Sequence, residues 1–139
     1  MRARVAAGSG PVRVVAGETT TVEVVVDVSR GFHIGSHPAE PAWGVPTEVG
    51  VSGACGAAVS VVGVEYPPPV RRGEGEGASA GYEGRGVVFR VGVTAKEGGQ
   101  RGAVDLEFEV RFQACEDEVC HRPEVVRCAV QARVEGAAR

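Results

Sequence analysis

The sequence predicts an all-β protein, and three observations support this prediction. First, the 139-residue chain holds 28 valines but only one leucine and one isoleucine, and β-branched valine favours the pleated strand over the helix. Second, apolar and polar side chains alternate with a period of two in several segments, and no stretch of about ten residues carries an apolar stripe of helical period. Third, 21 glycines and 8 prolines separate these segments with turn signals.

The alternating segments predict the strands in chain order. In residues 20–28, for example, the valines at positions 22, 24, 26 and 28 share one face. Before the last hairpin, strands are expected at Ala3–Ala7, Val12–Val15, Thr20–Val28, Phe32–Ile34, Thr47–Val51, Val59–Val64 and Gly86–Thr94. Many short strands separated by turns predict an immunoglobulin-like antiparallel β-sandwich, with residues 1–139 as a single domain.

Two segments between these strands are expected to be loops. His37–Pro46 contains three prolines and the only tryptophan of the chain, so we expect an ordered, extended loop there. Arg71–Gly81 is small, charged and rich in glycine, which makes it the best candidate for a mobile loop.

The last expected element is a β-hairpin with two cysteines at its tip. Between Val104 and Ala114 the even-numbered residues are apolar and the odd-numbered ones polar, and a similar alternation resumes between Val126 and Val134. Facing residues of antiparallel strands have Cα atoms about 4.5–5.5 Å apart, which is within the range that a disulfide needs. We therefore expect Cys115 and Cys120 to be bonded, or within bonding reach, in a short exposed loop.

This cysteine pair is open to several interpretations. Its spacing is compatible with a structural disulfide, with two free thiols, or with a site of thiol–disulfide exchange. Cys115, Cys120, His121 and Cys128 could also be written as a Cys3His zinc set. Cys128 argues against zinc, because it shares the core-facing side of its strand with the neighbouring valines. For the same reason we expect Cys128 to be buried and to take no part in exchange.

The charges beside the two cysteines predict which sulfur is the nucleophile. Cys115 is followed by three acidic residues at positions 116–118, which disfavour a thiolate, whereas His121 and Arg122 follow Cys120 and favour one. This asymmetry selects Cys120 as the attacking sulfur. The acidic residues would then help Cys115 to keep its proton, or would serve partner recognition.

The remaining cysteine and histidines carry weaker signals. Cys55 lies in a turn-rich stretch, so Cys55 and Cys128 are either idle thiols or a second, structural bridge. His33 and His37 bracket a strand end, and each is more often a hydrogen-bonded or exposed imidazole than a ligand. No cofactor or metal site is predicted.

The composition argues against several classes of partner. The net charge is −3 and the basic residues are scattered, so nucleic acid is not expected to bind. No stretch approaches the ~18–20 apolar residues of a membrane span. The first residues lack the apolar segment of a secretory signal, so the protein is either cytosolic or has lost its signal. The close cysteine pair favours an extracytoplasmic setting.

Five short motifs follow one another along nearly the whole chain, from about Val12 to Val134. They are Gly31-Phe32-His33-Ile34, Pro46-Thr47-Glu48-Val49, Glu65-Tyr66-Pro67, Tyr82-Glu83-Gly84, and Phe112-Gln113-Ala114-Cys115 followed by Cys120 and Pro123. In this order and rough spacing, the motifs resemble the N-terminal periplasmic domain of the DsbD family of thiol:disulfide interchange proteins. The cysteine hairpin is the most specific of the five.

The resemblance implies an immunoglobulin-like sandwich that moves electrons by thiol–disulfide exchange outside the cytoplasm. Cys115 and Cys120 would be the redox pair, and Cys120 would form the mixed disulfide with partners. The implied electron donor is a thioredoxin-like domain fed from a membrane-embedded partner. The implied acceptors are oxidised periplasmic disulfide isomerases or cytochrome-maturation proteins. A different class also stays open, namely a non-enzymatic immunoglobulin-like binding module whose hairpin disulfide is purely structural.

The sequence departs from this family at the loop that often shields the disulfide with an aromatic residue. Arg71–Gly81 has no aromatic residue, so Tyr82 or Phe32 would have to take over the shielding, or the disulfide is less protected. The family's membrane and thioredoxin-like domains are also absent, so the chain is expected to be an excised domain or a stand-alone relative.

Overall fold

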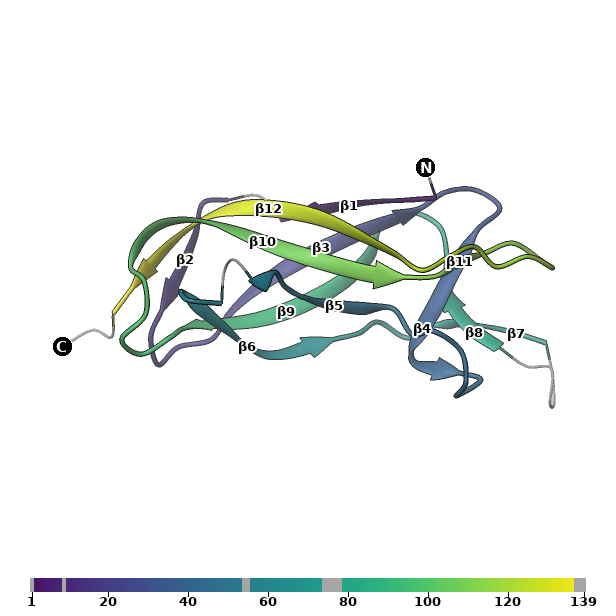
Figure 1. The fold of residues 1–139 in the computed structure, drawn as a ribbon, viewed down its shortest axis with the longest axis horizontal. Helices are drawn as coiled ribbons and strands as arrows, with labels where there is room; N and C mark the ends of the chain where they lie inside the picture. Colours follow the sequence, from purple (N-terminus) through teal and green to yellow (C-terminus); the bar gives the residue numbers. More distant parts are fainter. Residues whose placement is uncertain (1, 9, 54–55, 74–78, 137–139) are drawn as a thin grey trace.

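Two four-stranded sheets make up the body of the molecule (Figure 1). The computed structural model describes residues 2–8, 10–53, 56–73 and 79–136. The first sheet has the order β1-β3-β9-β6 and consists of β1 (Ala3–Ala7), β3 (Thr20–Val28), β9 (Val87–Ala95) and β6 (Val59–Glu65). The second sheet has the order β2-β12-β10-β5 and consists of β2 (Val12–Val15), β12 (Glu124–Glu135), β10 (Gly102–Phe112) and β5 (Glu48–Val51).

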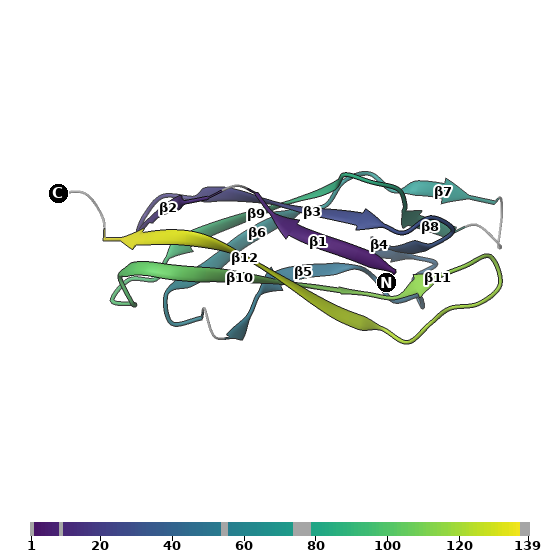
Figure 2. The same ribbon diagram turned by 90° about the horizontal axis from the view of Figure 1, so that it is seen from above.

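The order of these strands is that of an immunoglobulin-like sandwich. In such a fold the first, second, fifth and fourth strands form one sheet, and the third, sixth and seventh form the other. Here β1, β3, β9 and β6 correspond to the first set, and β5, β10 and β12 to the second. Figure 2 shows the two layers, with β3 and β9 in one and β10 and β5 in the other. The predicted all-β, immunoglobulin-like sandwich is confirmed, with one departure: β2 pairs with β12 in parallel rather than antiparallel.

The core lies between the two sheets and follows the predicted alternation. The even-numbered residues of β10 from Leu106 to Phe112 are 0 % exposed, while the odd-numbered ones face outward. Fully burying one such side chain stabilises the fold by about 1.5–3 kcal/mol. Valines of β3 and β9 complete the same apolar cluster from the opposite sheet. No helix long and apolar enough to cross a membrane is found in the part of the chain that the structure describes.

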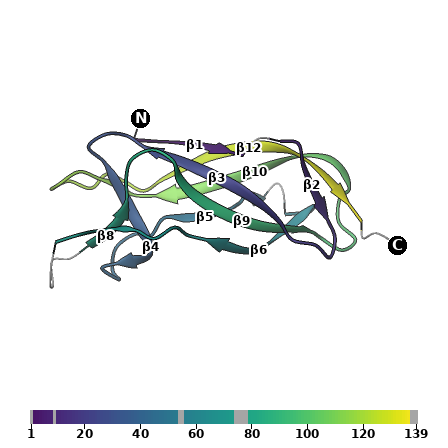
Figure 3. The ribbon, with the colours of Figure 1, turned by 180° about the vertical axis from the view of Figure 1, so that it is seen from behind.

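A third, smaller sheet closes one end of the sandwich. Its order is β11-β4-β8-β7, and it consists of β11 (Ala114–Cys115), β4 (His33–Glu40), β8 (Ser79–Tyr82) and β7 (Val70–Arg72). Viewed from behind, β4 and β8 again lie at the end of the molecule towards which the tip of the last hairpin extends (Figure 3). This sheet brings three separate parts of the chain next to the two cysteines.

Both segments expected to be loops contain strand. β4 extends from His33 to Glu40 and so includes the first part of His37–Pro46, with a register shift between Gly35 and Glu40. The prolines did not prevent pairing, because the irregularity allows the strand to resume after it. In Arg71–Gly81, residues 71–72 belong to β7 and residues 79–81 to β8, while residues 74–78 lie outside the described part of the chain. The two ends of the expected loop are therefore paired strands, and the expectation of mobility for residues 74–78 lies outside the described residues.

Candidate functional site

The two cysteines lie beyond the sandwich, where the hairpin of β10 and β12 continues to its tip. The ladder pairs Gly102 with Val134 and continues without interruption to Phe112 and Glu124. Past this point the returning strand has three residues, 121–123, against two on the outgoing strand, 113–114, before Cys115 faces Cys120. The extra residue on the returning strand makes a bulge there. The bulge includes Pro123, which has no backbone N–H to donate to a ladder.

Cys115 and Cys120 form a disulfide across this tip. Their Cα atoms are 4.0 Å apart, so the predicted pairing is confirmed. The backbone N–H of Glu116 donates to the carbonyl oxygen of Val119 at 2.7 Å and closes the turn. Cys120 is exposed, whereas Cys115 is partly buried. The two halves of the disulfide therefore differ in their access to solvent, and Cys120 is the half that another protein can reach.

The third sheet places a histidine beside the disulfide. β11 pairs with β4 so that Cys115 lies directly opposite His33, and facing residues in a sheet have side chains on the same side. Both cysteines and His33 line a depression of about 350 Å³ at this end of the molecule. The other residues that line it are Arg72, Gly73, Ser79, Glu116, Asp117 and Glu118.

Sequence reasoning missed Arg72 and Ser79, and treated His33 as an ordinary imidazole. These three residues reach the depression only because β4, β8 and β7 pair with one another in the third sheet. All three strands lie far from the cysteines in sequence. The only sequence signal for His33 was its place in the motif Gly31-Phe32-His33-Ile34. No signal distinguished Arg72 from the scattered arginines.

The electrostatics of the depression combine acidic residues at the tip with one arginine from β7. Burial lowers the pKa of His33 below its ordinary value, and the positive charge of Arg72 lowers that pKa further. Glu83 and Asp117 act in the opposite direction with smaller effects. Arg72 is held by an ion pair with Glu83. At neutral pH, His33 is thus favoured in its uncharged form.

His121 is held in place by three neighbouring side chains. Arg2 donates to its Nδ1 atom at 3.3 Å, so the Nε2–H of the neutral ring donates to the carboxylate of Glu116 at 2.9 Å. Phe32 packs against the same ring, with centroids 5.7 Å apart. Both ring nitrogens are therefore engaged away from sulfur, and neither His121 nor Arg122 lines the depression. The stabilisation of the Cys120 thiolate by these two residues stays a prediction.

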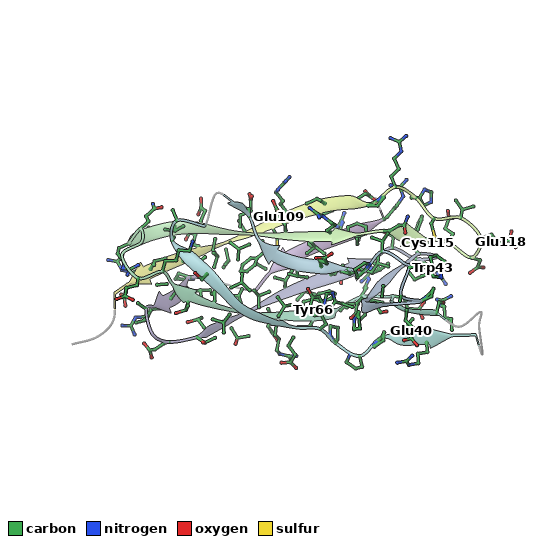
Figure 4. The ribbon with its side chains drawn as sticks, turned by 60° about the horizontal axis from the view of Figure 1, so that its bottom comes forward. Glu40, Trp43, Tyr66, Glu109, Cys115 and Glu118 are labelled. Carbon is green, nitrogen blue, oxygen red and sulfur yellow. A yellow bond between two sulfur atoms is a disulfide. The ribbon has the colours of Figure 1, made fainter. Side chains whose placement is uncertain are left out.

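Neither aromatic residue proposed as a shield lines the depression. Tyr82 is 2 % exposed, contacts Phe89 edge to face and accepts a hydrogen bond from the backbone N–H of His37. Phe32 packs on His121 instead. An exposed aromatic side chain does lie at this end of the molecule. It is that of Trp43, which is 88 % exposed. Figure 4 shows Trp43 at the same end as Cys115 and Glu118.

The other cysteines do not join the site. Cys128 carries a free thiol and faces Phe108 within the sandwich. It is partly rather than fully buried, which corrects the expectation of a buried thiol, although it does pack against the core. Cys55 lies outside the described residues. Among the described residues no group of three or more potential ligands could hold a metal ion, and the sulfurs that a zinc set would need are bonded to each other.

Comparison with known proteins leaves the function open. No protein-family model matches the chain, and no curated protein matches it. Among solved structures, the chain is similar to a family 123 glycoside hydrolase from Clostridium perfringens, with a TM-score of 0.43 and 7% sequence identity, over 95% of this chain and 27% of that one. The chain thus spans about a quarter of the length of that hydrolase, and a similarity at this level carries no argument about activity.

Proposed function

We propose that this protein is a thiol:disulfide exchange module that passes electrons to oxidised proteins through the Cys115–Cys120 pair. The observation that carries the proposal is the exposure of Cys120 within a disulfide that lies beyond the apolar core. A disulfide that served only to hold the sandwich together would be expected to join elements of the core. This one instead joins two neighbours at a hairpin tip, with a sequence separation of 5.

The proposed reaction begins with the pair in its reduced, dithiol form. The Cys120 thiolate attacks one sulfur of a partner disulfide, which forms a mixed disulfide and releases the other partner sulfur as a thiolate. The Cys115 thiolate then attacks the Cys120 sulfur, which re-forms the Cys115–Cys120 bond and releases the second partner sulfur. Two electrons and two protons pass to the partner, and the module becomes oxidised.

The donor and acceptors follow from the resemblance to the DsbD family. A thioredoxin-like dithiol would return the two electrons to the oxidised pair, and oxidised disulfide isomerases or cytochrome-maturation proteins outside the cytoplasm would receive them. The exposed side chain of Val119, between the two cysteines, is 55 % exposed. It offers an apolar contact beside the reacting sulfur to any such partner.

The reduction potential of the pair tests this proposal against a structural role. The protein is equilibrated with glutathione buffers of graded ratio, and the Cys115–Cys120 dithiol is quantified by alkylation and peptide mass analysis. An exchange module should titrate at about −180 to −270 mV, the range of known exchange proteins, whereas structural disulfides lie below about −300 mV. A value in the lower range would favour the binding-module alternative.

A further inference from the structure

Cys115 is poorly suited to the second step of the proposed reaction. It must lose its proton before it can attack the mixed disulfide on Cys120, because the thiolate is the nucleophile. Yet Glu116 and Asp117 follow it directly and both line the depression around the sulfurs. Their negative charges oppose a second negative charge on the Cys115 sulfur. A nearby group that takes up the proton would remove this obstacle.

His33 is placed to be that group. It lies opposite Cys115 in the pairing of β11 with β4, and both side chains line the same depression. The other histidine at the tip, His121, has both ring nitrogens occupied by Arg2 and Glu116. Within the described residues, His33 is the imidazole that shares the depression with the two sulfurs.

We propose that His33 accepts the proton of the Cys115 thiol as the mixed disulfide is resolved and then returns it to the departing partner sulfur. The inference rests on the proposed exchange function and assigns a proton carrier to its second step. In the step, the Cys115 S–H bond breaks and an imidazolium forms on His33. The Cys115 thiolate then bonds to the Cys120 sulfur, the Cys120–partner bond breaks, and the imidazolium protonates the departing thiolate. Charge and protons balance, and His33 ends the step neutral.

The groups around His33 favour this cycle of uptake and release. Cys115 faces it from β11, Arg72 approaches it from β7, Glu83 follows β8, and Asp117 belongs to the tip. Burial and Arg72 lower the pKa of His33, so the ring is neutral at pH 7 and able to accept a proton. The same two effects make its imidazolium a ready acid towards the departing thiolate. Glu83 and Asp117 raise the pKa of His33, so they limit how far that pKa is lowered and keep proton uptake feasible.

The test separates attack from resolution with one equivalent of dithionitrobenzoate, an aromatic disulfide whose released thiolate is yellow and too weakly basic to be protonated at pH 7. With this probe His33 passes the proton on to water or buffer, so the second phase reports proton uptake from Cys115. Mixed with the reduced 139-residue protein, the probe releases one thiolate when Cys120 attacks and a second when Cys115 resolves the mixed disulfide. The Cys115→Ser variant identifies the second phase, because it should show only the first. The variants compared are His33→Gln and, as a control that also lines the depression but does not titrate between pH 7 and 9.5, Ser79→Ala.

We expect His33→Gln to slow the second phase about tenfold at pH 7, below the 10²–10⁴-fold typical of general acid–base catalysis because water also reaches the tip. The first phase should stay within about twofold of the wild type. Near pH 9.5, where hydroxide removes the thiol proton, the two proteins should converge, and Ser79→Ala should behave as wild type throughout.

Two outcomes would overturn the role of His33: an unchanged second phase at pH 7, or a slowing of equal size at every pH, which would mark a structural effect. A wild-type protein that shows no second phase at all would instead contradict the proposed exchange function. The two failures are therefore distinguishable.

Discussion

At the scale of single residues, the two sulfurs of the disulfide differ chiefly in exposure. Cys120 is exposed and Cys115 partly buried, and the acidic residues 116–118 adjoin Cys115. The sequence argument reached the same choice of nucleophile through His121 and Arg122, but His121 is bound by Glu116 and Arg2. The preference for Cys120 thus depends on access and on the acidic neighbours of Cys115.

This difference predicts the reactivity of the two single-cysteine variants. Reduced Cys115→Ser, which keeps Cys120, should react a few-fold faster with a disulfide probe at pH 7 than Cys120→Ser, which keeps Cys115. Stopped-flow absorbance measures both rates under identical conditions. Equal rates, or faster reaction of the Cys120→Ser variant, would show that Cys115 is the nucleophile.

The free thiol of Cys128 should be alkylated more slowly than Cys120. Burial raises its pKa above the ordinary value, and the negative charge of Glu107 adds to this. At pH 8 the thiolate fraction is therefore lower than that of an unhindered cysteine, and its rate of alkylation should continue to rise above pH 9. Peptide mass analysis after reduction should show Cys128 alkylated at least about tenfold more slowly than Cys120. Comparable rates in the folded protein would mean that the thiol is not protected by the sandwich.

At the scale of elements, the third sheet depends on glycines that allow close approach. A Cβ atom added to Gly35 of β4 would lie 2.1 Å from the carbonyl oxygen of Val45, and one added to Gly81 of β8 would lie 2.6 Å from that of Ile34. Such contacts involve backbone and cannot be relieved by a side-chain rotation. Glycine at position 35 is therefore a condition for Val45 to lie against β4, and glycine at position 81 is a condition for the close pairing of β8 with β4.

Gly35→Ala should destabilise the protein by about 1–3 kcal/mol, the usual cost of overpacking. The matched control is Gly50→Ala on β5, where an added Cβ meets nothing within 4 Å, and its free energy of unfolding should change by less than about 0.5 kcal/mol. Urea unfolding followed by circular dichroism measures both. If the two variants were equally stable, the close approach of Val45 to β4 would not hold in solution.

The elements also show how far sequence reasoning reached. Strands with a clear period of two, such as β3 and β10, were predicted because each has one face in the core and the other in solvent. β4 was predicted only at its start, as Phe32–Ile34, and β7 and β8 were missed. β7 has only three residues, and glycine or proline weakens the local signal in β4 and β8, so long-range pairing supplies what propensity does not. The cysteine pair was therefore predictable from one hairpin. The placement of His33 and Arg72 beside the disulfide could be seen only in the assembled third sheet.

At the scale of the whole molecule, the apolar core and the disulfide at the hairpin tip occupy different regions. The core lies between the two large sheets, and the disulfide closes a loop beyond them with a sequence separation of only 5. Chain-entropy arguments give so short a loop a stabilisation of about 2 kcal/mol. The sandwich should therefore survive repeated opening and closing of the bond, as the proposed exchange cycle would require.

The double variant Cys115→Ser/Cys120→Ser tests this separation. It should keep the circular dichroism spectrum of the oxidised protein and lose about 2 kcal/mol of unfolding free energy in urea. Reduced wild-type protein is the control and should match the variant. A loss above about 4 kcal/mol, or an unfolded variant, would indicate that the bond is needed for the fold.

The acidic turn between the cysteines also predicts that salt changes how fast charged disulfides react with the pair. Residues 116–118 are exposed carboxylates, with no basic residue between Cys115 and Cys120. Long-range attraction or repulsion by such a turn weakens as the Debye length falls from about 30 Å at 0.01 M salt to about 8 Å at 0.15 M. Exchange with cationic cystamine should therefore slow as salt rises, while exchange with anionic glutathione disulfide should quicken. If the rates with the two small disulfides change in opposite directions as salt rises, the turn selects disulfides by their charge during diffusional encounter. If both rates change in the same direction, the turn does not steer encounters.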